Sequence, residues 1–194
     1  LNYTPMKSIN LKSLAAGIAL SAIVFSSQAQ TMDNTVLVGG ESMYPSKNII
    51  ENAVNSKKHT TLVAAVKAAG LVETLQSKGP FTVFAPVNDA FEDLPEGTVA
   101  TLLKPENKAT LTKVLTYHVV SGKYDYAALE KLITAGKGMA TLKTVSGGTL
   151  TIMKNGAHNI VVKDESGNIA NISTYDVIQS NGVIHVIDSV LLPK

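Results

Sequence analysis

The chain has 194 residues, of which 45% are hydrophobic and 16% are charged, a composition typical of one globular domain with an appendage. It contains no cysteine, which excludes a disulfide framework, a thiolate nucleophile and zinc–thiolate or iron–sulfur sites. All 17 basic residues are lysines, so recognition of phosphate or guanine by guanidinium groups is excluded as well.

Residues 1–29 are predicted to form a secretory signal peptide, whose true start is Met6. Two lysines precede an uncharged apolar run over residues 14–25, and small residues lead to Ala29, where we place the cleavage. The run is shorter than the ~20 residues that span a bilayer. Removing residues 1–29 takes away two of the 17 lysines and no acid, which leaves 15 lysines against 15 acidic residues. This balance of charges does not favour binding to nucleic acid or insertion into a membrane.

The mature chain is expected to begin with a flexible lead-in over residues 30–45, which contains a glycine pair and ends in proline. One domain then covers residues 46–194, with mostly helical patterning in its first half. Thr60 and Thr61 are candidate N-caps for a helix with apolar residues at helical spacing, and Gly70 is its predicted end.

Strand patterning interrupts these helices. Residues 81–85 are β-branched and aromatic and lie between prolines, which predicts a short buried strand. Asn88 is then expected to cap a helical turn. A helix beginning at Pro105 is predicted to run into a strand over residues 115–120, and another helix covers residues 126–134.

From Met139 onward the pattern predicts successive antiparallel strands rich in valine, isoleucine and threonine. Glycine-containing turn signals separate them at residues 146–148, 155–156, 166–167 and 181–182. Helices followed by hairpins indicate an α+β domain in which the early strands join the later sheet. The predicted core comprises Phe81, Val83, Phe84, Phe91, Leu115, Val183, Ile187 and Leu191.

The histidines give no metal-binding motif, because they lie 59, 40 and 27 residues apart. His118, Ser121 and Asp125 could be combined into a hydrolytic set, but such common residues do not define an enzyme. We therefore predict no catalytic residue, no metal and no cofactor. His118 and His185 have apolar neighbours on predicted strands, which indicates buried imidazoles that need hydrogen-bond partners. Asp89 and Asp188 are candidates for that role.

Three segments together resemble the fasciclin (FAS1) domain family. Residues 79–91, GPFTVFAPVNDAF, are similar to its first signature, and residues 182–193, GVIHVIDSVLLP, are similar to its second. Tyr117 and His118 lie between them, where the family carries a tyrosine–histidine pair. The resemblance covers nearly the whole mature chain.

The resemblance implies a wedge of antiparallel strands with a helical flank, in which the two signatures form neighbouring central strands. Their structural residues here are Thr82, Phe84, Asn88, Asp89, His185 and Asp188. In animal members the tyrosine–histidine segment and an aspartate–isoleucine pair are implicated in receptor binding, and Asp176-Val177 occupies the latter position here. Val87 also departs from the family pattern, because it replaces a common threonine.

The resemblance and the export signal predict a periplasmic or extracellular, non-catalytic adhesion module for matrix, a cell-surface protein or a polysaccharide. The proposed contact residues are Tyr117, His118, Tyr124, Tyr126, Asp176 and Val177, because tyrosines offer stiff amphipathic contact area. The alternative is a periplasmic small-ligand or lipid carrier, which would need a pocket among the helices of residues 47–114. The third hypothesis is a hydrolase that uses His118 as its general base.

Overall fold

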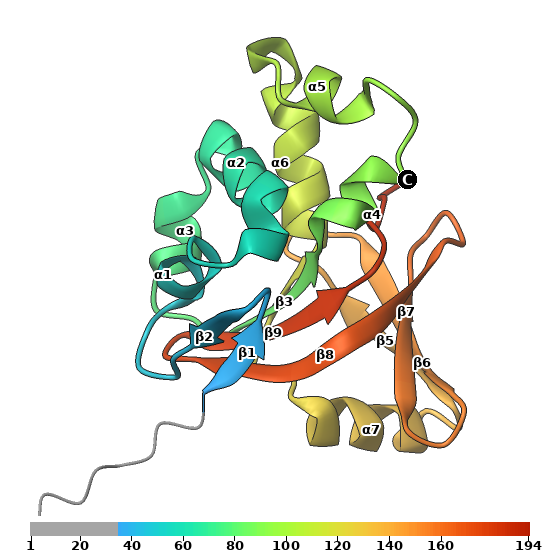
Figure 1. Ribbon diagram of the computed structural model, residues 1–194. Helices are drawn as coiled ribbons and strands as arrows, with labels where there is room; N and C mark the ends of the chain where they lie inside the picture. Colours follow the sequence, from blue (N-terminus) through green and yellow to red (C-terminus); the bar gives the residue numbers. More distant parts are fainter. Residues whose placement is uncertain (1–34) are drawn as a thin grey trace, which may run out of the picture. The chain divides into compact units, whose positions relative to one another are not determined.

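The computed structural model describes residues 35–194 (Figure 1), so the predicted signal peptide lies outside the described residues. At its centre β3 (Phe81–Pro86) and β9 (Gly182–Ile187) lie side by side as a parallel pair. The prediction that the two signature segments form neighbouring strands is therefore confirmed. Every residue of β9 and all of β3 beyond Phe81 are buried, because both faces of these strands are covered.

These two strands belong to a seven-stranded sheet with the order β4-β3-β9-β8-β7-β6-β5. The remaining strands are β4 (Val119–Ser121), β5 (Met139–Lys143), β6 (Thr149–Asn155), β7 (Asn159–Lys163) and β8 (Ile169–Gln179). All pairs except β3–β9 are antiparallel, and β5 to β9 form the expected succession of hairpins. The edge strands approach each other where the Val145 amide donates to the Val119 carbonyl at 2.8 Å, which nearly closes the sheet.

Helices cover the sheet on opposite sides (Figure 1). One group lies over β3 and β9 and consists of α1 (Ile49–Ala53), α2 (Thr60–Ala69), α3 (Val72–Gln76) and α6 (Lys108–Tyr117), whereas α7 (Tyr126–Ala135) packs against β5 and β6. The shorter elements are α4 (Asn88–Glu92), α5 (Thr98–Leu102) and the 3₁₀ turns η1 (Lys57–His59) and η2 (Pro105–Asn107). The described residues thus form the predicted α+β architecture.

Residues 36–43 correct the expectation of a flexible lead-in. They form a hairpin of β1 (Val36–Val38) and β2 (Glu41–Met43), and Val38 and Met43 are buried against α1 and α2. Gly39 and Gly40 both have positive φ, which is the conformation that the tight turn requires. The glycine pair therefore marks a hairpin turn. Burial of Val38 and Met43 holds the hairpin against the rest of the domain.

The expected strand over residues 115–120 is also wrong for its first half. The helix α6 continues to Tyr117, His118 is its C-cap residue, and β4 begins only at Val119. Leu111, Val114 and Leu115 are all buried at the spacing of one helix face, and this face extends to Leu115, where the strand was predicted to begin. Packing on α2 outweighs the local strand preference.

The core divides into two main clusters of buried side chains on the two sides of the sheet. The first lies under α1, α2, α3 and α6, and the second lies between the curved sheet and α7. The buried members of the predicted core are Val83, Phe84, Leu115, Val183, Ile187 and Leu191. Phe81 and Phe91 are only half-buried, because each lies at the margin of its cluster.

Candidate functional site

A row of aromatic rings crosses the molecule from its centre to one surface. Phe84 on β3 stacks on the imidazole of His185 on β9, with ring centroids 5.7 Å apart. His185 in turn meets Tyr175 on β8 at 6.0 Å, and Tyr175 meets Tyr126 of α7 edge to face at 5.1 Å. The row therefore joins both signature strands to two tyrosines at the surface.

His185 is a neutral, hydrogen-bonded member of this row. Its Nε2 donates to the carbonyl of Tyr124 at 2.7 Å, and the Asp176 amide points to its Nδ1 at 3.4 Å. Burial lowers the pKa of His185, because the desolvated imidazolium is disfavoured. The partners are backbone groups, so the expectation that Asp89 or Asp188 serves this histidine is wrong.

Asp176 ties β8 to the start of α7. It lies in a stretch of irregular pairing between β8 and β9 and has φ 55°, an unusual value that aspartate tolerates. Its Oδ1 accepts a hydrogen bond from the Tyr126 amide at 2.7 Å, and Asp125 Oδ1 accepts one from the Ala128 amide at 2.9 Å. Two carboxylates thus serve free amides at one helix N-terminus and fix the position of Tyr126.

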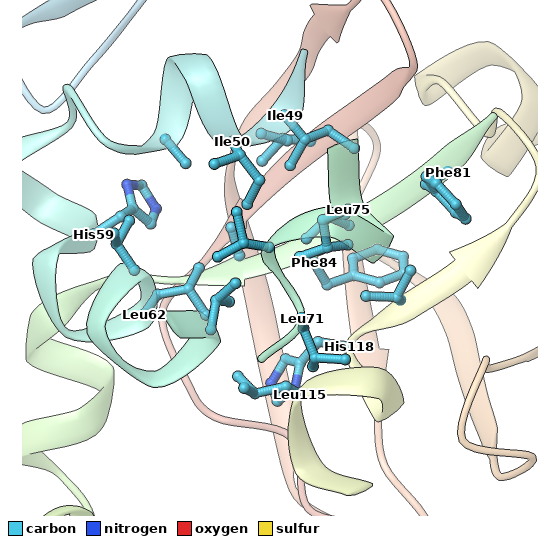
Figure 2. Close-up of a pocket in the computed structure, with 18 of the residues that line it drawn as sticks. Ile49, Ile50, His59, Leu62, Leu71, Leu75, Phe81, Phe84, Leu115 and His118 are labelled. Atoms are coloured by element: carbon cyan, nitrogen blue, oxygen red, sulfur yellow. The ribbon is translucent and has the colours of Figure 1, made fainter. Parts of the chain in front are cut away.

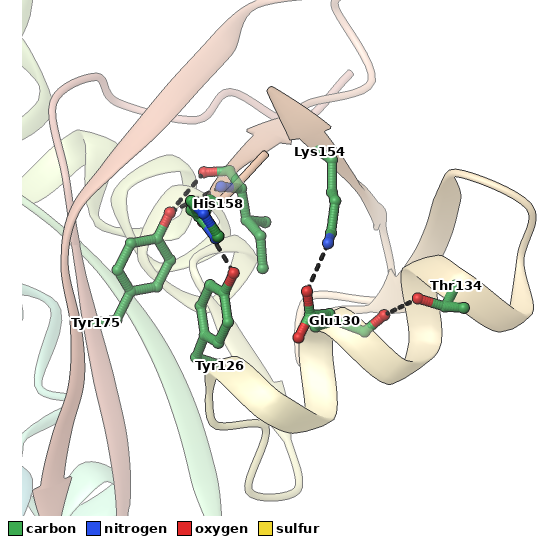
Figure 3. Close-up of polar contacts among 7 residues, drawn as sticks. Tyr126, Glu130, Thr134, Lys154, His158 and Tyr175 are labelled. Carbon is green, nitrogen blue, oxygen red and sulfur yellow. Dashed lines mark hydrogen bonds and ion pairs between the residues drawn. The ribbon is translucent and has the colours of Figure 1, made fainter. Parts of the chain in front are cut away.

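The surface tyrosines are held in place by the backbone of β7 and the turn before it (Figure 3). Tyr126 Oη donates to the His158 carbonyl at 2.9 Å, and Tyr175 Oη accepts from the Ile160 amide at 2.7 Å. An ion pair between Glu130 and Lys154 lies beside them. We call the half-buried residues Tyr124, Tyr126, Tyr175 and Asp176 the tyrosine surface.

Three of the predicted contact residues are not at the surface. Tyr117 is 0% exposed, His118 3% and Val177 1%, so they form core and not contact surface. Tyr117 Oη donates to the Thr149 carbonyl at 2.7 Å and accepts from the Glu165 amide at 3.0 Å, which joins α6 to β6 and to the turn after β7. The sequence pattern cannot separate the two kinds of tyrosine, because Tyr117, Tyr126 and Tyr175 each follow a polar residue in an element of mixed burial.

His118 is buried with both ring nitrogens occupied. Its Nδ1 donates to the Val114 carbonyl at 2.8 Å, and its Nε2 accepts from the Leu191 amide at 3.0 Å. Burial lowers its pKa to about 4. Because neither nitrogen is available to an exposed Ser121, the geometry does not build the hydrolytic set with Asp125.

The remaining signature residues have structural roles. Thr82 Oγ1 donates to the Gly122 carbonyl and accepts from the Tyr124 amide, which positions the segment before α7. Asn88 does not cap its own helix as expected; its Oδ1 accepts from the Thr61 amide and so caps α2 instead.

The two signature aspartates do not reach the histidines. Asp89 is exposed in the first turn of α4, and Asp188 accepts two hydrogen bonds from Asn171 at the surface. Within residues 35–194 no group of three or more histidine, cysteine or acidic side chains is arranged to hold a metal ion. Tyr175 is a member of the tyrosine surface that the sequence analysis missed, although it directly precedes Asp176.

The paired signature strands and the residues around them define a fasciclin fold, and residues 57–193 match the model of the Fasciclin domain. The chain therefore belongs to the fasciclin family.

Two groups of relatives are similar along most of this chain. Protein sll1483 of Synechocystis sp. is 44% identical over 167 residues, which cover 86% of this chain and 84% of that protein. Transforming growth factor-beta-induced protein ig-h3 of Sus scrofa is 33% identical over 150 residues, which cover 77% of this chain and 20% of the larger protein. The same domain thus occurs in a bacterial protein of comparable length and as a part of a larger animal protein.

A solved FAS1 domain pair from the insect cell adhesion molecule fasciclin I has the same fold. The TM-score is 0.67 at 22% sequence identity, with 77% of this chain and 52% of that chain covered. Within residues 35–194, no helix is long and apolar enough to cross a membrane.

Proposed function

We propose that this chain is an exported, non-catalytic binding module that holds a protein or polysaccharide partner through its tyrosine surface. The observation that carries the proposal is the group of half-buried tyrosines fixed to backbone groups at the start of α7 and on β8. Membership of the fasciclin family and a fold shared with a cell adhesion molecule support it. The predicted signal peptide over residues 1–29 supports export to the periplasm or beyond.

The tyrosine surface has properties that favour contact with a partner. Tyrosine rings supply a large, stiff and amphipathic area that suits both apolar side chains and the faces of sugar rings. Because hydrogen bonds already orient Tyr126 and Tyr175, little side-chain entropy is lost on binding. Asp176 adds a carboxylate whose second oxygen can accept from a hydroxyl or an amide of the partner.

The non-catalytic part of the proposal is supported by the histidines. His118 and His185 each have both ring nitrogens directed at backbone groups, which removes them as general bases. The two acidic residues of the signatures, Asp89 and Asp188, both lie exposed.

The proposal is tested by retention of bacterial cells and of extracted extracellular polysaccharide on the immobilised protein. The double variant Tyr124→Ala, Tyr126→Ala removes two rings at the surface while leaving Asp176 in place. We expect this variant to retain at least about ten-fold less of the true partner, because aromatic anchors carry much of the binding energy of an interface.

The matched control is Tyr44→Ala, which removes a tyrosine that is 39% exposed and lies outside the tyrosine surface. It should retain as much partner as the unmodified chain. Thermal unfolding of all three proteins establishes that each is folded. Equal retention by the folded double variant and the control would refute the assignment of the surface.

A further inference from the structure

The dipeptide asparagine-glycine occurs twice in the chain, at residues 155–156 and 181–182. Both pairs lie where two antiparallel strands are joined: the first connects β6 to β7, and the second connects β8 to β9. Glycine has no Cβ that would shield its backbone nitrogen from the side chain of the preceding residue. The two pairs therefore have the same local chemistry, and their surroundings make the difference between them.

Asn181 is fixed by three hydrogen bonds. Its Oδ1 accepts from the Ile49 amide at 3.0 Å, and its Nδ2 donates to the carbonyls of Leu75 and Ser77 at 2.8 Å and 3.0 Å. Ile49 in α1 and Leu75 in α3 are buried and line an apolar pocket of about 80 Å³ (Figure 2), so Asn181 is tied to two packed helices. While these hydrogen bonds persist, its side chain cannot turn toward the nitrogen of the buried Gly182.

Asn155 has the opposite surroundings. Asn155 and Gly156 are both exposed, and within residues 35–194 neither the Asn155 side chain nor the Gly156 amide forms a hydrogen bond. The turn is also open, because a Cβ added at Gly156 would meet nothing within 4 Å. The side chain of Asn155 is therefore free to approach the Gly156 nitrogen.

We propose that Asn155 is a site of spontaneous deamidation, since asparagine is among the thermolabile residue types. The Gly156 backbone nitrogen gives up its proton and attacks Asn155 Cγ. A bond forms between these two atoms, the bond from Cγ to Nδ2 breaks, and Nδ2 takes up a proton and leaves as ammonia. Water then opens the resulting five-membered imide at either of its two carbonyls, which gives aspartate or isoaspartate. Water is the only co-reactant, and nothing is oxidised or reduced.

The modified turn supports the tyrosine surface. Tyr126 Oη donates to the His158 carbonyl at 2.9 Å, and His158 lies in the turn between β6 and β7 (Figure 3). Isoaspartate adds one carbon to the backbone at the position that pairs with Asn159, so the His158 carbonyl must shift. The deamidation goes beyond the proposed binding function and does not depend on it, although it alters the hydrogen bond that holds Tyr126.

The test compares both asparagines in one sample of the unmodified chain. The protein is incubated at mildly alkaline pH, and its peptides are mapped by mass spectrometry, which distinguishes a side-chain amide from a carboxyl. We expect Asn155 to be converted at least about ten-fold faster than Asn181, because conversion of Asn181 requires a local opening that breaks its hydrogen bonds. Asn159 is exposed in the same hairpin but precedes Ile160, so it is the internal control and should stay unchanged.

The same incubation in urea separates the effect of the structure from that of the sequence. In the unfolded chain both asparagine-glycine pairs are exposed, so their rates should become similar. Asn155→Gln keeps an amide on a longer side chain that cannot form the five-membered imide, and it should remove the conversion at this turn. In the isolated isoaspartate form, the NMR signals of the Tyr126 ring should shift, whereas those of Tyr44 should not.

An Asn155 that stays intact in the folded chain but is converted in urea would overturn the proposal, because the turn would then protect it. Equal rates at Asn155 and Asn181 in the folded chain would also overturn it, since the hydrogen bonds of Asn181 would then make no difference. Unchanged Tyr126 signals in the isoaspartate form would refute the effect on the tyrosine surface.

Discussion

Phe84 and His185 lie opposite each other in the parallel pair of β3 and β9, and their rings are 5.7 Å apart with an interplanar angle of 28°. Both side chains are 0% exposed, and His185 donates from its far side to the segment that precedes α7. One contact therefore joins the two sequence signatures and supports the tyrosine surface. Changes at this contact should affect both stability and the position of Tyr126.

Replacement of Phe84 by alanine is expected to lower the free energy of unfolding by about 3–5 kcal/mol, because it removes a buried ring and leaves a cavity. Urea denaturation measures the loss. Phe81→Ala on the same strand is the matched control and should cost clearly less, since that ring is only half-buried. Equal losses for the two variants would mean that Phe84 is not central to the core.

Tyr117→Phe should destabilise the protein by about 1–3 kcal/mol without changing partner retention. The variant keeps the buried ring but leaves the Thr149 carbonyl and the Glu165 amide without their shared hydroxyl. Tyr44→Phe, at an exposed tyrosine, is expected to be neutral. Loss of retention by a folded Tyr117→Phe protein would instead place this residue at the contact surface.

Stability should fall as the pH decreases from about 6.5 to about 4, and His118 supplies about 3 kcal/mol of this change. The unfolded chain binds a proton on this histidine below about pH 6.5, whereas the folded protein, in which burial lowers the pKa to about 4, does not. The contribution is fully present above pH 6.5 and is lost on approaching pH 4. Burial lowers the pKa values of His59 and His185, which act in the same direction.

Urea denaturation at pH 7, 5.5 and 4.5 checks this dependence. His118→Leu should be less stable at pH 7 and should show a flatter pH profile, because one of the three contributing imidazoles is gone. His158→Gln replaces an exposed histidine and should preserve the slope. An unchanged slope in the folded His118→Leu protein would contradict the burial of a neutral imidazole.

Asn88→Ala is expected to cost about 1–2 kcal/mol, the usual range for loss of a helix cap. Here the cap belongs to a different helix, since Asn88 Oδ1 accepts from the Thr61 amide and its Nδ2 donates to the Lys57 carbonyl. Hydrogen exchange should therefore accelerate in the first turn of α2. The neighbouring Asp89→Ala, at an exposed position, should change stability by less than about 0.5 kcal/mol and leave that exchange unaltered.

Local patterns were sufficient to predict the strand at Phe81, the hairpins after Met139 and the helix from Tyr126. In each of these segments propensity, turn residues and burial agree, so the local signal and the tertiary structure coincide. The same patterns misassigned residues 36–43 and 115–117. In those segments contacts with distant residues decide the conformation, as with Val38 and Met43 in the first core cluster.

The sequence alone determined the α+β class through its local patterns, and the resemblance of its two signature segments to the fasciclin family implied that they pair. Only the tertiary structure decided that Tyr117 and His118 are core while Tyr126 and Tyr175 reach the surface, and that Asn88 caps α2. Burial and hydrogen-bond partners depend on residues brought together from distant parts of the chain, and no local spacing encodes them.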